Sequence, residues 1–250
     1  MRFCVLGKGQ LLRGLLAGVL LLGLLYRAPE LPVFRAMGRN IPIYRVGTEE
    51  QAAAIGINCA WDCGDLPDIL SALEREQVKA TFFLLGDWCR KYPDMVREIA
   101  AHGHEIGSHC DTHTDLTTLS QEQIRGQVEN GAAAVEQLTG KPVELIRTPS
   151  GAYNNLVTGT IEELGYYSIQ WDVDTLDWKG LSAQDIRQRS RAMKNGSILL
   201  IHSGSQNGAQ ALPLILRDMK ERGLSPVTVG ELIYRGQYQV DATGEQHPAP

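Results

Sequence analysis

Apolar and polar residues alternate along this chain in two repeating patterns from about residue 53 onward. Short apolar runs predict β-strands, and segments with an apolar residue at every third or fourth position predict amphipathic helices. In the segment 66–76, for example, Leu66, Ile69, Leu70 and Leu73 fall on one helical face. The predicted strands are 53–58, 80–85, 105–108, 144–147, 167–172, 197–202 and 226–229, and the predicted helices are 66–76, 93–102, 121–138, 157–164, 183–193 and 209–222.

The regular alternation of strands and helices defines the expected fold class. Strand–helix units that repeat in this way form a parallel sheet, which is either open or closed into a barrel. About seven strands in some 190 residues favour a compact, irregular barrel, and no internal sequence repeat accompanies them. We therefore expect an α/β protein with a distorted parallel (β/α) barrel.

The ends of the chain differ from its middle. Arg2, Lys8 and Arg13 precede an apolar run at 14–25, which is typical of a secretory signal or a membrane anchor. Because no small-residue cleavage site follows, we favour an uncleaved single-pass anchor over a cleaved signal or a buried helix. The positive charges should keep the first end in the cytoplasm and the rest outside. The expected domains are 1–30 signal anchor, 31–50 linker, 51–235 catalytic domain and 236–250 disordered tail.

Composition and charge exclude some functions. A formal net charge of -5 leaves no broad basic face for nucleic acid, although a local basic patch stays open. We expect a monomer.

The cysteines are Cys4, Cys59, Cys63, Cys89 and Cys110. None forms a C-x-x-C pair, so a structural zinc ribbon is not indicated, and buried free thiols are favoured over a disulfide or an extra metal ligand.

Polar residues that suit catalysis follow the predicted strands. They are Asn58, Asp62, Asp65, His109, His113, Arg147, Asp174, Asp177 and His202. In parallel α/β folds the carboxyl ends of the strands carry the active site, so this distribution predicts an enzyme. If the turn after residue 108 is helical, His109 and His113 share one face and can bind a metal together with Asp62 or Asp65. The alternative is that both histidines are ordinary surface or core residues.

Five segments in this order and spacing resemble the NodB-type polysaccharide deacetylases of carbohydrate esterase family 4. They are Ala-Thr-Phe-Phe-Leu (80–84), Gly-His-Glu-Ile-Gly-Ser-His (103–109), Arg-Thr-Pro-Ser-Gly-Ala-Tyr (147–153), Trp-Asp-Val-Asp-Thr-Leu-Asp-Trp (171–178) and Ile-Leu-Leu-Ile-His (198–202). The resemblance covers roughly residues 53–233. It implies a distorted barrel and hydrolysis of acetyl groups on a glycan with one divalent metal ion, zinc or else cobalt or nickel.

The resemblance also implies roles for particular residues. His109 and His113 match the metal histidines, and Arg147 matches the arginine that orients the catalytic base. Asp177 matches the aspartate that steadies a general-acid histidine, here His202. The substrate-binding candidates are Ser150, whose backbone N–H would stabilise the oxyanion, together with Tyr153 and Trp178 of the sugar groove. The alternatives are a structural ion pair between Arg147 and Asp177 and a histidine with no catalytic role.

The first family motif, Thr-Phe-Asp-Asp-Gly, is the place where this chain departs from the pattern. Residues 57–65 read Ile-Asn-Cys-Ala-Trp-Asp-Cys-Gly-Asp. One register makes Asp62 the base and puts Cys63 in the ligand place. The other follows a spore-associated branch of the family, makes Asp65 the metal ligand and puts Asn58 in the base position. We favour Asp65 for the metal over a role as helix N-cap alone, and Asp62 as a substitute base.

These expectations define one leading function and two rivals. The leading function is metal-dependent deacetylation of an extracytoplasmic glycan, such as peptidoglycan or a chitin-like oligosaccharide. Asparagine cannot act as a general base near neutral pH, so the first rival is a glycan-binding pseudoenzyme. The second rival is a structural envelope protein, which would not need the histidine pair.

Overall fold

The computed structural model describes residues 40–249 of the chain. The predicted signal anchor and the first part of the predicted linker therefore lie outside the described residues. Within residues 40–249, no helix has both the length and the apolar character needed to cross a membrane.

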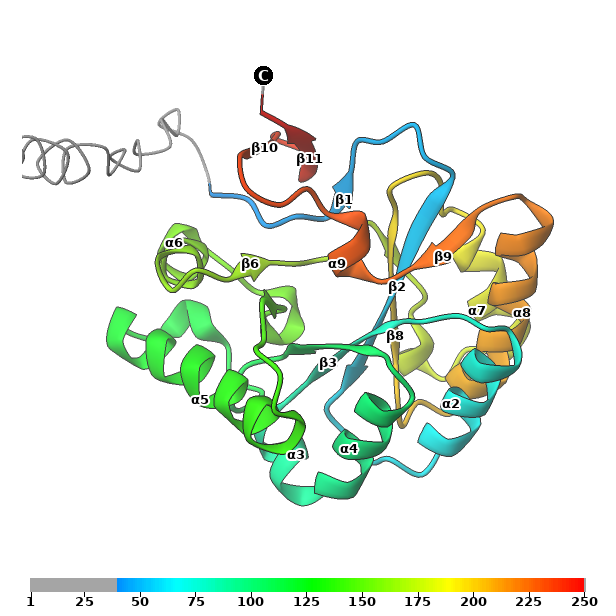
Figure 1. Cartoon of the computed structure of the whole chain (residues 1–250), viewed down its shortest axis with the longest axis horizontal. Helices are drawn as coiled ribbons and strands as arrows, with labels where there is room; N and C mark the ends of the chain where they lie inside the picture. The colour runs from blue at the N-terminus through cyan, green and yellow to red at the C-terminus, as the bar shows by residue number, and fades with distance from the viewer. Residues whose placement is uncertain (1–39, 250) are drawn as a thin grey trace, which may run out of the picture. The chain divides into compact units, whose positions relative to one another are not determined.

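A curled parallel sheet forms the centre of the described domain (Figure 1). Its seven-strand path runs β6-β5-β4-β3-β2-β8-β7, and an eighth strand, β9, pairs with the start of β2. The strands are β2 (Ala52–Cys59), β3 (Thr81–Leu84), β4 (Glu105–Ser108), β5 (Leu145–Ile146), β6 (Tyr167–Ser168), β7 (Val173–Asp174), β8 (Ile198–His202) and β9 (Ser225–Val227). All of the pairings are parallel. The predicted α/β fold with a distorted parallel barrel is confirmed.

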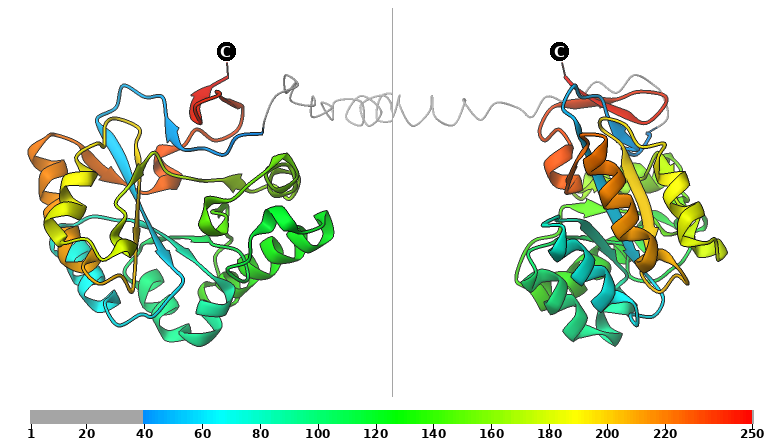
Figure 2. Two further views of the ribbon diagram at one scale, coloured as in Figure 1. Left: turned by 180° about the vertical axis from the view of Figure 1, so that it is seen from behind. Right: turned by 90° about the vertical axis from the view of Figure 1, so that its right-hand side faces the viewer.

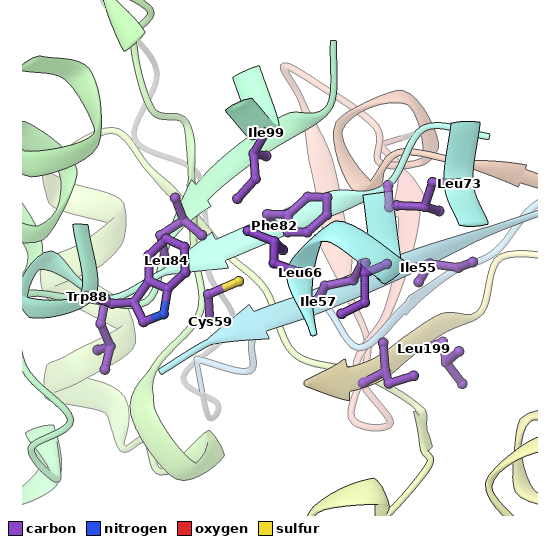
Figure 3. Close-up of a cluster of buried hydrophobic side chains, with 14 of the residues drawn as sticks. Ile55, Ile57, Cys59, Leu66, Leu73, Phe82, Leu84, Trp88, Ile99 and Leu199 are labelled. Atoms are coloured by element: carbon purple, nitrogen blue, oxygen red, sulfur yellow. The ribbon is translucent and has the colours of Figure 1, made fainter. Parts of the chain in front are cut away.

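The central strand β2 has two different faces because successive side chains alternate across a strand. Ile55, Ile57 and Cys59 pack with the helices in one core cluster (Figure 3). Ala54 belongs to a second cluster, which includes Phe83 and Leu145 of the neighbouring strands. Gly56 and Asn58 have the same parity as Ala54. Asn58 therefore projects to the concave face of the sheet, away from the helices.

Helices cover the convex face of the sheet (Figures 1 and 2). They are α2 (Leu66–Arg75), α3 (Gly86–Lys91), α4 (Pro93–Ala101), α5 (Gln121–Thr139), α6 (Asn155–Glu163), α7 (Ala183–Ser190) and α8 (Gly208–Glu221). The short α9 (Val229–Leu232) after β9 packs instead in the second cluster, with Ala54 and Phe83. The apolar residues Leu66, Ile69 and Leu73 of α2 pack beneath β2, as their spacing predicts. Helix α3 was not predicted because its six residues carry no apolar periodicity.

Three predicted strands are clearly shorter in the structure. The segment 144–147 pairs only over the two residues of β5. The segment 167–172 pairs only as β6, and the chain then turns and re-enters the sheet as β7. The segment 226–229 ends as a strand at Val227, because Thr228 begins α9 with a capping box that includes Glu231.

The prediction that residues 31–50 form a linker is wrong for residues 40–50, which the structure describes. Ile43 and Val46 are buried in the core cluster on the concave side of the sheet. Ile43 forms a bridge to Ile169 after β6, and the backbone N–H of Val46 donates to the carbonyl of Gly196 before β8. This segment, with β1 at Arg45–Val46, therefore fills the space between the two ends of the open sheet.

The predicted disordered tail is also corrected for residues 236–249. Strands β10 (Tyr238–Val240) and β11 (Glu245–Pro248) form an antiparallel pair, and β11 pairs with β1. Gln246 is fully buried, and its side-chain amide bonds both backbone groups of Tyr234. Short polar sequence alone does not reveal this order, because the stabilising partners lie in distant segments.

Candidate active site

The carboxyl ends of the central strands bring several predicted residues together. Asn58 at the end of β2 is directly opposite His202 at the end of β8. His109 follows β4, and Arg147 follows β5 with its backbone N–H bonded to the carbonyl of Ser108. These strand ends are neighbours in the sheet order, so residues far apart in the sequence share one edge.

His202 and Asp177 form a buried hydrogen-bonded pair. The Nδ1 of His202 lies 2.9 Å from Oδ1 of Asp177, and the backbone N–H of His202 donates to Oδ2 at 2.8 Å. Burial alone would raise the pKa of Asp177, but its hydrogen bonds to His202 lower the pKa below its ordinary value. An ionised Asp177 accepts the Nδ1 proton, which leaves Nε2 of His202 as the nitrogen available for proton transfer.

Arg147 is fully buried beneath the site without a carboxylate partner. Its Nη1 donates to Oδ1 of Asn58 at 3.1 Å, and its Nη2 donates to the carbonyl of Gln170 at 3.1 Å. The guanidinium carbon lies 3.9 Å from the ring centre of Phe83, and Nε has no hydrogen-bond partner. Burial lowers the pKa of Arg147 to about 9. Within residues 40–249 Arg147 forms no ion pair, so the alternative of a structural pair with Asp177 is wrong.

His109 and His113 lie together, although the turn between them is not helical. Residues 111–113 form bends, and Cys110 has a positive φ of 68°. The two rings are 5.4 Å apart between centres at an angle of 67°. Burial lowers the pKa of His109 to about 3, so its imidazole is neutral. Its Nδ1 lies 2.7 Å from the carbonyl oxygen of Arg147, which requires the proton on Nδ1 and leaves the Nε2 lone pair free.

Asp65 is held by the turn that follows β8. Its Oδ1 accepts the backbone N–H of Gly204 at 2.7 Å, and its buried Oδ2 has no hydrogen-bond partner. The side chain makes no capping hydrogen bond to α2, so a role as N-cap alone does not describe it. Burial raises the pKa of Asp65. A buried carboxylate oxygen without a donor is chemically suited to a metal ion.

Asp62 has a different environment from Asp65. It is exposed, and its Oδ1 accepts the backbone N–H of Gly64 at 3.0 Å, which closes the tight turn after Trp61. Cys63 beside it is a partly buried free thiol. Both residues lie in the same loop as Asp65, and among residues 40–249 the hydrogen bond of the Asp62 side chain goes to Gly64 of that loop and to none of His109, His113 and Arg147.

The three predicted substrate-binding residues lie on two loops. Ser150 is exposed in the turn after β5 and has a positive φ of 56°, a strained conformation for a residue with a Cβ. Tyr153 is partly buried, and its hydroxyl lies 3.4 Å from that of Tyr44. Trp178 is exposed directly after Asp177, with the Lys179 ammonium 4.9 Å from its ring centre.

The described residues contain no preassembled metal site of three ligands. Within residues 40–249, no group of three or more His, Cys, Asp or Glu side chains is placed to hold a metal ion. The available donors are His109 with a free Nε2, His113 beside it, and the unpartnered oxygen of Asp65. These donor types match a divalent metal such as zinc, so the residues fit the group chemically.

Sequence reasoning did not assign roles to three residues that complete this edge. Gly204 positions Asp65, Gln170 accepts from Arg147 through its carbonyl, and the Trp61 ring stacks on His202. The sequence signal that could have indicated Gly204 is a glycine just after a strand that ends in a candidate catalytic histidine.

A separate cleft of about 820 Å³, lined by Arg45, Lys194, Arg222 and His247 among others, contains none of the site residues.

Comparisons with known proteins agree with this architecture. The polysaccharide deacetylase family matches residues 49–169. The uncharacterized protein YlxY of Bacillus subtilis is 32% identical over 193 residues, which cover 77% of this chain and 60% of YlxY. A peptidoglycan-N-acetylglucosamine deacetylase of Bacillus cereus is 31% identical over 196 residues, which cover 76% of this chain and 92% of the relative.

One solved structure among the relatives is described as a pseudoenzyme. BA3943 of Bacillus anthracis, a CE4 family pseudoenzyme, matches with a TM-score of 0.74 at 33% identity, over 76% of this chain and 68% of BA3943. A mutant of it, described as having restored enzymatic activity, matches with the same TM-score of 0.74. The fold, the strand-end residues and these similarities show that the chain belongs to the polysaccharide deacetylase family, carbohydrate esterase family 4.

Proposed function

We propose that this chain is a metal-dependent carbohydrate deacetylase that hydrolyses N-acetyl or O-acetyl groups on a glycan. The observation that carries the proposal is the buried His202–Asp177 pair, with 2.9 Å between Nδ1 and Oδ1. A buried aspartate that fixes the tautomer of a strand-end histidine is the arrangement that general acid catalysis needs. A protein that only packs against the envelope has no use for it.

The residues of the chain then have the following roles. Asp62 takes the proton of the attacking water, and the backbone N–H of Ser150 donates to the developing oxyanion. With His202 in its doubly protonated form, Nε2 donates its proton to the leaving amine or alcohol, while Asp177 accepts the Nδ1–H and holds the ring in place. A divalent ion, when bound by His109, His113 and Asp65, supplies Lewis-acid polarisation of the acetyl carbonyl.

The metal assignment has a direct test. We propose zinc, with cobalt or nickel as alternatives, because two imidazoles and one carboxylate suit these ions. His109→Ala and Asp65→Ala should both lower metal content measured after dialysis, and Asp62→Asn should not. Asp65→Ala with full metal content would remove Asp65 from the ligand set.

The substrate and the location are proposed together. Relatives include a peptidoglycan-N-acetylglucosamine deacetylase, and the apolar run at 14–25 predicts a single-pass anchor. We therefore propose an extracytoplasmic glycan such as peptidoglycan, or a chitin-like oligosaccharide, and a monomeric enzyme at the cell membrane. Protease added to intact spheroplasts should digest the domain. Complete protection with an intact membrane would contradict this location.

A second candidate function is a glycan-binding pseudoenzyme, and one observation favours it. The Nη1 group of Arg147 donates a hydrogen bond to the amide oxygen of Asn58. Asn58 occupies the position that the spore-associated register assigns to the catalytic base. An amide cannot take a proton from water near neutral pH, and general-base help contributes roughly 10²–10⁴-fold to the rate. The similarity to BA3943, described as a pseudoenzyme, supports this alternative.

Acetate release from acetylated chitooligosaccharides and from peptidoglycan, with added zinc, separates the two functions. The deacetylase proposal predicts release by the parent protein, and at least ~10²-fold slower release by Asp62→Asn. Release that is unaffected by Asp62→Asn would remove Asp62 as the base. No release by the parent under any metal, together with measurable glycan binding, would identify the pseudoenzyme.

A further inference from the structure

Two exposed tryptophans lie in loops next to the residues of the His202–Asp177 pair. Among residues 40–249, the large apolar side chains that are exposed are Trp61 at 45%, Leu156 at 44% and Trp178 at 51%. Trp178 directly follows Asp177, and Trp61 lies in the loop after β2. In the sheet, β8 with His202 lies between β2 and β7, so the loops that carry the two tryptophans follow the strands on either side of β8.

The Trp61 ring is stacked on the imidazole of His202. The ring centres are 5.0 Å apart, and the planes are inclined by only 21°. One face of the indole is therefore covered by His202, and the exposed fraction of the side chain must come from its other face and edges. The stacking covers one face of the imidazole, and 12% of the His202 side chain stays exposed.

The loop that carries Trp61 is anchored on the turn after β8. A Cβ on Gly204 would lie 3.0 Å from the carbonyl oxygen of Asp62 and 3.3 Å from Cβ of Trp61, and Gly204 has a positive φ of 76°. Only glycine permits both this conformation and this approach. The Gly204 N–H also bonds Asp65, so the loop is held from both ends. The indole is consequently a preorganised surface.

We propose that the free face of Trp61 is a sugar-binding subsite that stacks on a pyranose ring next to the residue being deacetylated. This inference rests on the proposed glycan substrate. The C–H face of a pyranose is apolar, and covering an exposed indole with it removes apolar surface from water on both partners. Because the loops that carry Trp61 and Trp178 follow the strands on either side of β8, the site should bind oligosaccharides in preference to single N-acetylhexosamine residues.

The experiment measures binding of tetra-N-acetylchitotetraose and of N-acetylglucosamine to the purified full-length chain by calorimetry. Trp61→Ala should weaken tetramer binding roughly tenfold, equivalent to about 1.4 kcal/mol, and should leave monosaccharide binding almost unchanged. Trp61→Tyr should restore most of the affinity, because it restores an aromatic face. Leu156→Ala, on the exposed surface of α6, is the matched control and should bind as the parent does.

His202→Phe separates the subsite from the chemistry. It keeps an aromatic ring beneath Trp61 but cannot transfer a proton, so tetramer affinity should stay near the parent value while any acetate release is lost. Weaker binding by Trp61→Ala without acetate release in the parent would support the subsite and reject the deacetylase. Unchanged tetramer affinity and KM in Trp61→Ala, with normal acetate release, would reject the subsite alone. Absence of tetramer binding by the parent would overturn the subsite as well.

Discussion

Asn58→Asp is the substitution with the most informative expected outcome, because it places a carboxylate against the buried Arg147. The guanidinium has only neutral oxygen partners, from Asn58 and Gln170, and its Nε has none. Burial lowers the pKa of Arg147 to about 9. An ordinary guanidinium titrates at least ~3 pH units higher, which corresponds to about 4 kcal/mol at 1.36 kcal/mol per pH unit. Most of the cost of burying this charge is therefore not offset by an opposite charge.

The free energy gained by pairing the new carboxylate with Arg147 is smaller than the cost of burying the Arg147 charge. Position 58 is itself buried, so the carboxylate must also lose its hydration. The 1–3 pH-unit effect of an adjacent arginine on an aspartate corresponds to roughly 1.4–4 kcal/mol. Desolvation of the carboxylate reduces this to an expected net stabilisation of about 1–3 kcal/mol near neutral pH. The arginine lowers the pKa of the introduced carboxyl below its unfolded value. The stabilisation is therefore present above the unfolded pKa of ~3.9 and is lost as the pH falls through the folded pKa.

Thermal unfolding at pH 8 and at pH 3 measures this effect. Asn58→Asp should raise Tm by several degrees at pH 8, since 1 kcal/mol moves Tm by about 2–4 °C for a domain of this size. The rise should shrink at pH 3. Asn130→Asp on the exposed surface of α5 makes the same change in net charge and should leave Tm almost unaltered.

Acetate release by the same preparations tests the catalytic half of the reasoning. If Asn58 faces the attacking water, Asn58→Asp should raise the rate by at least ~10²-fold, the low end of general-base contributions. A Tm at pH 8 below that of the parent would refute the electrostatic reasoning. It would mean that the amide, the carbonyl and the Phe83 ring already satisfy the Arg147 charge.

Three further substitutions test the structure itself. Burial lowers the pKa of His104 to about 4, whereas an unfolded histidine titrates near ~6.5. As the pH falls from ~6.5 toward 4, the unfolded chain binds a proton that the folded chain does not, and the free energy of unfolding therefore decreases. His104→Phe should remove up to ~3 kcal/mol of acid destabilisation in that window, measured by urea unfolding. Gln246→Leu leaves the partly buried backbone N–H and carbonyl of Tyr234 without these hydrogen bonds and should cost roughly 1–3 kcal/mol, whereas exposed Gln239→Leu on the same hairpin should cost little. Gly56→Ala would place a Cβ 2.5 Å from Nη2 of Arg147 and should lower Tm more than any of these.

The order of elements could be read from the sequence because it depends on local periodicity. The apolar positions of 66–76 and 121–138 match α2 and α5, and the runs at 53–58 and 197–202 match β2 and β8. Parallel pairing then places the residues that follow the strands at one edge. The pairing of His202 with Asp177 came from the family resemblance instead, and the helical turn assumed for His109 and His113 is absent although their rings lie 5.4 Å apart.

Only the tertiary structure could distinguish the environments of Asp62 and Asp65 and place Trp61 on His202. The hydrogen bond from Arg147 to Asn58 is the pairing that the family resemblance implied. It alone also showed that Ile43 and Val46 fill the gap in the sheet, and that the polar residues 238–248 pair as strands. Loop and edge residues have no repeating pattern, so the direction of their side chains depends on contacts with distant segments. The periodicity of a sequence determines which elements form, whereas the loops acquire their conformation only after those elements have packed.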